Sequence, residues 1–221
     1  MSSVSNSVLV FDMVGTLLDA SALDPDFERY FGAPLRREWF SELQSLVQVG
    51  VITGLPISFA AAAKAAVKIL EERHAHRLEA EQRDEILGRL KALPVFADVP
   101  EGLAQLAARG FTLAVLTNSA AVVAGEVLGR AGIARHFSKI LSAADAARLK
   151  PAPEPYHMAA RVLGVEPGAV LMIAAHAWDL AGAAQSGCRT AFLARPGQVM
   201  NALAPEPDFS APSLTALAGR L

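Results

Sequence analysis

The sequence is poor in cysteine and has no concentration of charge. Its one cysteine, Cys188, has no partner within the chain for a disulfide, so nothing favours an oxidising compartment. The 20 basic and 22 acidic residues give a net charge of -2, without a run of like charges. That balance provides no footprint for a nucleic-acid backbone or an anionic membrane, so we expect neither as a partner.

Long apolar runs are also absent. No stretch approaches the ~20 apolar residues needed to span a bilayer. The polar start of the chain has no cationic segment, and Asp12 ends the short apolar run at residues 8–11, which does not fit a secretory signal. We therefore expect a cytoplasmic protein.

What the sequence does have is a large apolar fraction. Of its 221 residues, 52% are hydrophobic and 19% are charged, which indicates a globular chain that folds without disulfides. After Pro94, short apolar runs alternate with helical patterns. Strands are expected at residues 8–11, 111–116, 139–142, 169–175 and 189–194, and helices at 100–109, 122–131, 154–163 and 179–185. This alternation predicts an α/β fold with a mostly parallel, Rossmann-like sheet flanked by helices.

Residues 24–93 follow a different pattern. Leucines and valines recur there at helical spacing, with turn signals at Gly32 and between Gly50 and Pro56 and an amphipathic helix pattern at residues 79–93. We expect an all-helical cap at residues 20–94, inserted into a core domain made of residues 1–19 and 95–221. The Pro-rich stretch 204–212 is expected to be a loop before a last short helix.

Several polar residues stand where the expected strands end. They are Asp12, Thr117, Asn118, His176 and Asp179, with Lys150 in the loop before the helix at 154–163. Each alone has an ordinary explanation, as a turn former, a helix cap or a solvated charge. In a parallel sheet, however, the carboxyl ends of the strands meet at one edge, where α/β proteins bind their ligands. We therefore expect an active site at that edge, beneath the cap.

Four short motifs carry a resemblance to a known family. FDMVGTL at residues 11–17 resembles the first signature of the haloacid dehalogenase-like superfamily. TNS at 117–119 is similar to the second signature, Lys150-Pro151 to the third, and MIAAHAWD at 172–179 to the fourth. The resemblance implies the superfamily's α/β core and helical cap, and it makes Asp12 the covalent nucleophile.

One position distinguishes the superfamily's dehalogenases from its phosphatases. The phosphatases carry a second aspartate two residues after the nucleophile, as general acid for an alkoxide leaving group, and use Mg²⁺ to offset the phosphate charge. Here that position is Val14, which cannot donate a proton. General acid–base help is typically worth ~10²–10⁴-fold, whereas halide leaves as a stable anion without it. Val14 therefore argues against a phosphatase, and we expect neither a metal nor a cofactor.

Other features are similar to the type II dehalogenases, which act on L-2-haloacids. The stretch from Lys150 to Tyr156 has their spacing, and Trp178 precedes Asp179 as in their fourth motif. Arg37, preferred over Arg36, lies where those enzymes carry a halide-binding arginine. The aromatic residues Trp39, Phe40 and Phe59 are candidates for a wall that excludes water.

The fourth motif also departs from those enzymes. They place a serine and an asparagine where this chain has Ala174 and His176. The imidazole either bridges backbone groups at the strand end or helps to polarise the hydrolytic water beside Asp179.

The resemblance implies a two-step hydrolysis of a short L-2-haloacid. Asp12, kept anionic by Lys150, attacks the α-carbon and expels halide, which gives an ester. The expected contacts of the substrate are the backbone N–H groups of Met13 and Val14, the Thr117 hydroxyl, Tyr156 and Trp178, and those of the halide are Arg37 and Asn118. Water positioned by Asp179, with His176, then hydrolyses the ester to a 2-hydroxy acid.

The sequence leaves two alternative functions open, and it does not determine the oligomeric state. The first alternative is a Mg²⁺-dependent phosphatase of the same superfamily, acting on a small phosphorylated metabolite. The second is a catalytically idle relative that binds a small acid or a protein. Type II dehalogenases are often dimers, so a homodimer is compatible with the resemblance although no heptad pattern demands one.

Overall fold

The computed structural model describes residues 8–221, and the chain divides into two compact units. The core unit comprises the described part of Met1–Asp19 together with Val95–Leu221. The helical unit comprises Ala20–Pro94. None of the helices within residues 8–221 has the length and hydropathy needed to cross a membrane.

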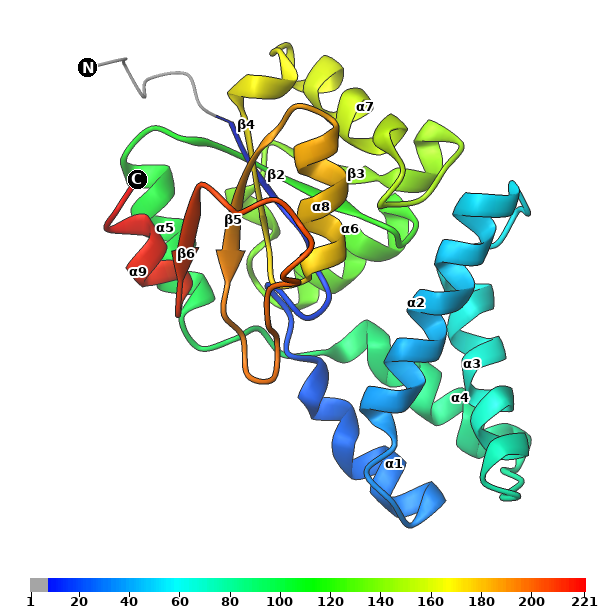
Figure 1. Ribbon diagram of the computed structural model, residues 1–221. Coiled ribbons are helices and arrows are strands. Elements are labelled where there is room, and N and C mark those ends of the chain that lie inside the picture. Colours follow the sequence, from blue (N-terminus) through cyan, green and yellow to red (C-terminus); the bar gives the residue numbers. More distant parts are fainter. Residues whose placement is uncertain (1–7) are drawn as a thin grey trace. The chain divides into compact units, whose positions relative to one another are not determined.

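The core unit contains a six-stranded parallel sheet (Figure 1), which confirms the expected α/β class. In spatial order the strands are β3 (Lys139–Ser142), β2 (Thr112–Thr117), β1 (Val8–Phe11), β4 (Val170–Ala174), β5 (Arg189–Leu193) and β6 (Phe209–Ala211). The chain order reverses beside β1, because β2 pairs on one side of it and β4 on the other. Ligands of such sheets bind at the carboxyl ends of the strands next to this switch point, where Asp12 directly follows β1.

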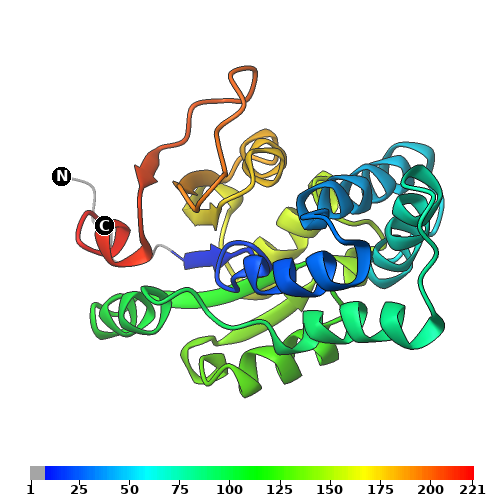
Figure 2. The same ribbon diagram turned by 90° about the horizontal axis from the view of Figure 1, so that it is seen from below.

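Both faces of the sheet are covered by helices, as its apolar strands require. The helices α7 (Pro153–Leu163) and α8 (Ala177–Gln185) lie on one side, and α5 (Val99–Ala108) and α6 (Ala121–Arg130) on the other (Figure 2). Alternate residues of β1, Val8 and Val10, pack in a cluster with Met172 of β4 and with Met158 and Leu180 of the first pair. Short 3₁₀ helices η3 (Ala134–His136), η4 (Ala143–Ala146) and η5 (Pro167–Ala169) complete the connections.

The C-terminal segment differs from expectation. Residues 204–212, expected to be a loop, contain the edge strand β6, which pairs with β5 through Ala191 and Phe209. Three residues are too short a run to give a periodic signal, so the strand depends on its neighbour rather than on local pattern. The last helix, α9 (Leu214–Ala218), begins after Ser213, whose hydroxyl accepts from the Ala216 N–H.

The two chain segments that flank the helical unit lie side by side within the core unit. Leu18 and Val95 form an antiparallel bridge, and the Phe96 N–H donates to the Leu17 carbonyl at 3.0 Å. The core unit thus holds both ends of the inserted segment together.

The helical unit consists of α1 (Asp24–Phe31), α2 (Arg36–Thr53), α3 (Phe59–Arg73) and α4 (Ala80–Arg89), with the 3₁₀ helices η1 (Ala20–Leu23) and η2 (Leu90–Ala92). The turn expected between Gly50 and Pro56 is present but begins later than Gly50, because α2 runs through this residue to Thr53 and is capped by Gly54, whose φ is 76°. A Cβ on Gly50 would lie 3.0 Å from the Ile57 Cβ, so this glycine permits close packing instead. The helix expected to run to residue 93 ends at Arg89.

Trp39 is part of the interior of the helical unit. Its side chain is fully buried, its Nε1 donates to the Ala63 carbonyl at 3.0 Å, and its ring lies 5.5 Å from that of Phe27. The indole is therefore part of this core, and the expected place of Trp39 in a wall that excludes water stays a prediction. Phe40 and Phe59 are half-buried.

Candidate active site

Three charged residues from separate strand ends meet inside the core unit. The Lys150 Nζ lies 2.9 Å from Asp12 Oδ1 and 2.6 Å from Asp179 Oδ2, and it also donates to the Leu116 carbonyl at 2.8 Å. Lys150 and Asp179 have no exposed surface, and Asp12 retains 6%. This arrangement brings together the three charged residues that the sequence singled out.

Asn118 fixes the loop that delivers Lys150. Its Oδ1 accepts from the Lys150 N–H at 2.8 Å, and its Nδ2 donates to the Lys150 carbonyl at 3.2 Å. The Lys150–Pro151 peptide that follows is cis. The amide of Asn118 thus has a structural task in addition to the halide contact that we expected of it.

Tyr156 holds Asp179 from the other side. Its hydroxyl donates to Asp179 Oδ1 at 2.6 Å, and only 1% of the residue is exposed. Burial, followed by the charge of Asp179, raises the pKa of Tyr156 well above its ordinary value, so the phenol keeps its proton. A Cβ on Gly182 would lie 2.8 Å from this hydroxyl, which explains a glycine in α8. Tyr156 thus contacts Asp179, and the expected contact of Tyr156 with substrate stays a prediction.

The environment separates the two carboxylates of the cluster. Burial alone would raise the pKa of Asp12, but the Lys150 charge and the His176 hydrogen bond outweigh it and hold that pKa below its usual range. Burial and the neighbouring charge of Asp12 raise the pKa of Asp179 despite the opposing effect of Lys150. Lys150 loses some basicity to burial, yet the two carboxylates raise its pKa overall. Such a divergence assigns an anion to Asp12 and makes Asp179 the stronger base.

The second oxygen of Asp12 accepts two further hydrogen bonds. Thr16 Oγ1 donates to Asp12 Oδ2 at 2.7 Å and itself accepts from the Ala175 N–H at 3.0 Å, which directs the hydroxyl proton towards Asp12. The His176 Nδ1 lies 3.1 Å from the same oxygen. Because an ionised carboxylate only accepts, Nδ1 carries the hydrogen. His176 therefore contacts Asp12 itself, and not only backbone groups.

The imidazole of His176 fits tightly between its neighbours. Its ring is stacked on that of half-buried Trp178, with centroids 5.5 Å apart and 21° between the planes. On another side lies Gly15, where an added Cβ would come within 2.9 Å of the imidazole Cε1 and Nε2. Gly15 also has a φ of 82°, so both the backbone and the space call for glycine here.

Met13, Val14 and Thr117, the residues expected to bind the substrate carboxylate, are also in the core unit. Met13 and Val14 form the buried turn after Asp12, and the Met13 carbonyl accepts from the Leu17 N–H at 2.9 Å. Thr117 is buried at the end of β2, and its hydroxyl accepts from the Ser119 N–H at 3.2 Å.

The two arginines considered for halide belong to the helical unit. Arg36 is paired with Asp24 at 2.5 Å, whereas Arg37 is exposed in the first turn of α2. The cluster around Asp12 is therefore built by the core unit alone, and the role of Arg37 stays a prediction.

Two residues of the site were not singled out from the sequence. Thr16 lies in the first motif, and its hydroxyl four residues after Asp12 was a usable signal. The sequence held no such signal for Arg195, because this residue follows β5 outside the four motifs. Its Nε donates to the Thr16 carbonyl at 3.0 Å and its Nη1 to Asp98 Oδ1 at 2.7 Å.

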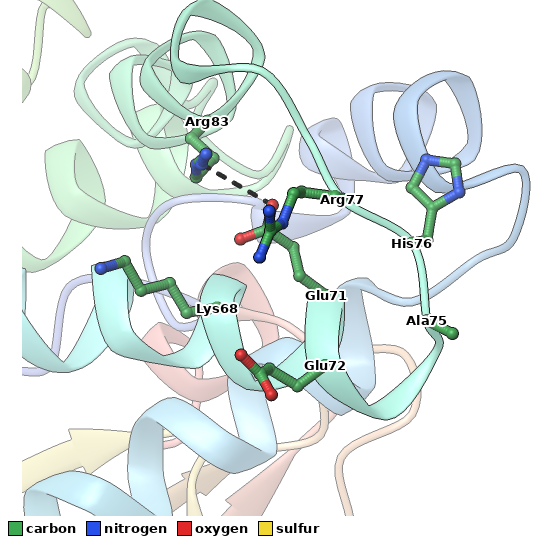
Figure 3. A pocket seen from close by; sticks show the side chains of 7 residues that line it. All are labelled: Lys68, Glu71, Glu72, Ala75, His76, Arg77 and Arg83. Atoms are coloured by element: carbon green, nitrogen blue, oxygen red, sulfur yellow. Dashed lines mark ion pairs between the residues drawn. The ribbon is translucent and has the colours of Figure 1, made fainter.

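Two other features lie apart from this cluster. Burial raises the pKa of the Cys188 thiol to about 11, as expected for a packed and unreactive cysteine. A hollow of about 550 Å³ in the helical unit lies between the end of α3 and the start of α4 (Figure 3). It is lined by solvated charges, including the Arg83–Glu71 pair at 3.7 Å, and contains none of the expected site residues.

Comparison with known proteins decides the family. The model of the haloacid dehalogenase-like hydrolases matches residues 7–187. The chain belongs to this family. It is a hydrolase, as the four motifs indicated.

Relatives of this haloacid dehalogenase-like hydrolase include both kinds of enzyme considered above. The (S)-2-haloacid dehalogenase of Pseudomonas sp. strain YL is 26% identical over 95% of this chain and 91% of that protein. The L-2-haloacid dehalogenase of Xanthobacter autotrophicus, solved with chloropropionic acid covalently bound, has a TM-score of 0.89 at 22% identity, covering 96% of this chain and 97% of that one. A phosphoglycolate phosphatase of Neisseria meningitidis is 36% identical, but over 42% of this chain and 40% of that protein.

The Mg²⁺ ion of the family's phosphatases does not fit these residues. Val14 offers no side-chain oxygen, and each oxygen of the Asp179 carboxylate is engaged at 2.6 Å, one with Lys150 and one with Tyr156. Within residues 8–221, no group of three or more His, Cys, Asp or Glu side chains is arranged to hold a metal ion. The ammonium of Lys150 lies between the carboxylates of Asp12 and Asp179, where a metal ion would have to bind.

Proposed function

We propose that this hydrolase is an (S)-2-haloacid dehalogenase that converts short L-2-haloacids to 2-hydroxy acids through an ester on Asp12. The observation that carries the proposal is the buried ammonium of Lys150, held between an ionised Asp12 and an Asp179 of raised pKa. The full-length similarity to a protein named (S)-2-haloacid dehalogenase supports the choice of substrate.

In the first step a carboxylate oxygen of Asp12 attacks the α-carbon of the haloacid. The new C–O bond forms as the carbon–halogen bond breaks, and the halide departs with the bonding electrons and needs no proton. Burial strips water from Asp12 and so removes a hydration shell that would weaken the nucleophile. The proton-free departure explains why Val14 serves where a phosphatase needs an acid.

In the second step water attacks the Asp12 carboxyl carbon and the ester C–O bond to the substrate breaks. Asp179 accepts one proton from the water and returns it to the departing 2-hydroxy acid oxygen. Asp12 leaves this step as a carboxylic acid and becomes an anion again by releasing the second proton of the water to solvent, which its lowered pKa favours. The raised pKa of Asp179 favours this role. Thr16 and His176, which donate to Asp12 Oδ2, hold the carboxyl group during both steps.

The proposed substrate is a small 2-haloacid, and the proposed reaction uses no cofactor. We assign its carboxylate to the N–H groups of Met13 and Val14 and to the Thr117 hydroxyl, and its halogen to Asn118 and to Arg37 of the helical unit. We further propose a cytoplasmic location. Assembly into a homodimer is a prediction that sedimentation equilibrium would check.

The deciding experiment measures halide release from the L and D enantiomers of 2-chloropropionate after treatment with a chelator. We expect chloride from the L enantiomer and D-lactate as product, and none from Asp12→Asn that remains folded and is protected from deamidation. Single turnover in ¹⁸O-water should place the label in Asp12. An Asp12→Asn protein with substantial activity, or a wild type without chloride release, would refute the proposal.

A phosphatase is the second candidate, because of the local identity to the phosphoglycolate phosphatase. Hydrolysis of p-nitrophenyl phosphate that requires Mg²⁺, with no chloride release, would establish it instead.

A further inference from the structure

We infer that Arg195 is a positioning residue, which holds the turn after Asp12 so that Thr16 reaches the nucleophile. The residue lies just beyond β5, at the same edge of the sheet as Asp12, and is only 5% exposed. The inference goes beyond the proposed function and rests on it only for the choice of substrate in one assay.

The guanidinium of Arg195 contacts two separate chain segments of the core unit. Its Nε donates to the Thr16 carbonyl at 3.0 Å, its Nη1 donates to Asp98 Oδ1 at 2.7 Å, and its centre lies 4.1 Å from the ring centroid of Phe96. Thr16 precedes the helical unit in sequence, whereas Phe96 and Asp98 follow it. One side chain thus ties together the segments on both sides of the insertion.

Thr16 connects Arg195 to the nucleophile Asp12. Its carbonyl is held by Arg195, while its hydroxyl donates to Asp12 Oδ2 at 2.7 Å and accepts from the Ala175 N–H at 3.0 Å. Thr16 has no exposed surface, so in the wild type the guanidinium, and not bulk water, is the donor to its carbonyl. Loss of Arg195 would leave that carbonyl unpaired, and the turn would relax away from the geometry that aims the hydroxyl.

The hydrogen bonding of Arg195 is incomplete, which is unusual for a purely structural residue. Among the described residues, its buried Nη2 has no hydrogen-bond partner. Buried charges are a poor source of stability, and apolar replacements often do as well. The planar fork does what an apolar side chain cannot, because it donates to a carbonyl and a carboxylate in fixed directions.

The test compares Arg195→Gln and Arg195→Lys with a matched control, Arg189→Gln. Arg189 stands at the other end of β5 and also has a carboxylate partner, Asp208 at 3.5 Å, and an aromatic one, Phe209 at 5.4 Å. Hydrogen exchange of the amides of residues 13–18 is measured together with kcat and KM for L-2-chloropropionate.

We expect Arg195→Gln to lose exchange protection in residues 13–18 and to lower kcat by roughly 10- to 100-fold, with KM within about twofold of wild type. Arg195→Lys should recover part of the loss, and Arg189→Gln should change neither quantity. Full kcat and full protection in a folded Arg195→Gln would overturn the inference.

If Arg195→Gln does not fold, Arg195→Lys decides, because kcat and protection equal to wild type would again overturn the inference and a loss of both would support it. A wild type that releases no halide refutes the proposed function, whereas the exchange measurement still tests the role of Arg195.

Discussion

Lys150 offers the sharpest test of the charge arrangement, through the substitution Lys150→Met. Methionine has a similar reach and no charge, so it removes the ammonium while filling the space. The change leaves the carboxylates of Asp12 and Asp179 buried together without a cation, and the Leu116 carbonyl without its donor.

The size of the effect follows from the burial of all three groups. Breaking a buried ion pair by removing one partner typically costs about 3–5 kcal/mol. An unpaired buried carbonyl adds about 1–3 kcal/mol when it finds no other donor. We expect a loss of at least about 4 kcal/mol near neutral pH, a large share of the roughly 5–15 kcal/mol that stabilises a typical domain.

The loss should depend on pH in a stated direction. Without the ammonium, the folded state binds protons on Asp12 and Asp179 more tightly than the unfolded state does, so their folded pKa values lie above the unfolded ones. Such groups contribute stability below the unfolded pKa and lose it as pH rises through the folded pKa. Relative to wild type, Lys150→Met is therefore less impaired in mild acid than at neutral pH.

Urea unfolding of both proteins at about pH 5 and about pH 8 measures this difference. The double variant Lys150→Met/Asp179→Asn, which removes one of the two stranded charges, should regain part of the stability at the higher pH. A penalty below about 1 kcal/mol, or one equal at both pH values, would refute the reasoning.

Two further substitutions test the neighbours of the cluster. Tyr156→Phe removes the hydrogen-bond donor to Asp179 and should slow release of the hydroxy acid by about tenfold, while an initial burst of halide persists. Rapid-quench analysis of both products measures the two rates, and equal slowing of halide and hydroxy acid release would contradict the prediction. Gly15→Ala should lower both stability and kcat, because its Cβ would displace the imidazole of His176. Gly164→Ala is the control, since Gly164 has a similar φ of 72° but nothing within 4 Å of the added carbon; unfolding and steady-state kinetics should show it to impair stability alone.

The parts of the fold that depend on local pattern were predictable from the sequence. The central strand β1 reads as a short apolar run because both of its faces are buried, and β3 was expected at the residues where it lies. Since parallel strands place their ends together, the same pattern predicted that Asp12 and Asp179 would meet. The ordering of Lys150 between them could only be expected from the family resemblance.

What the sequence did not predict depends on contacts between distant residues. The edge strand β6 forms only because β5 lies beside it. Gly50 is required by its close packing against Ile57, which the local sequence does not indicate. Arg195 becomes meaningful only through Thr16, which is 179 positions away in the chain. Such contacts have no period, so no local pattern reports them.

The bridge between Leu18 and Val95 also bears on how the family diversifies. Because the core unit brings both ends of the insertion together, the rest of the sheet does not depend on what the chain does between them. Lengthening such a closed loop costs little, about 0.6 kcal/mol of chain entropy for each doubling. The segment at residues 20–94 is therefore an exchangeable module, and a different segment spliced between these two positions should leave the fold of the core unit unchanged.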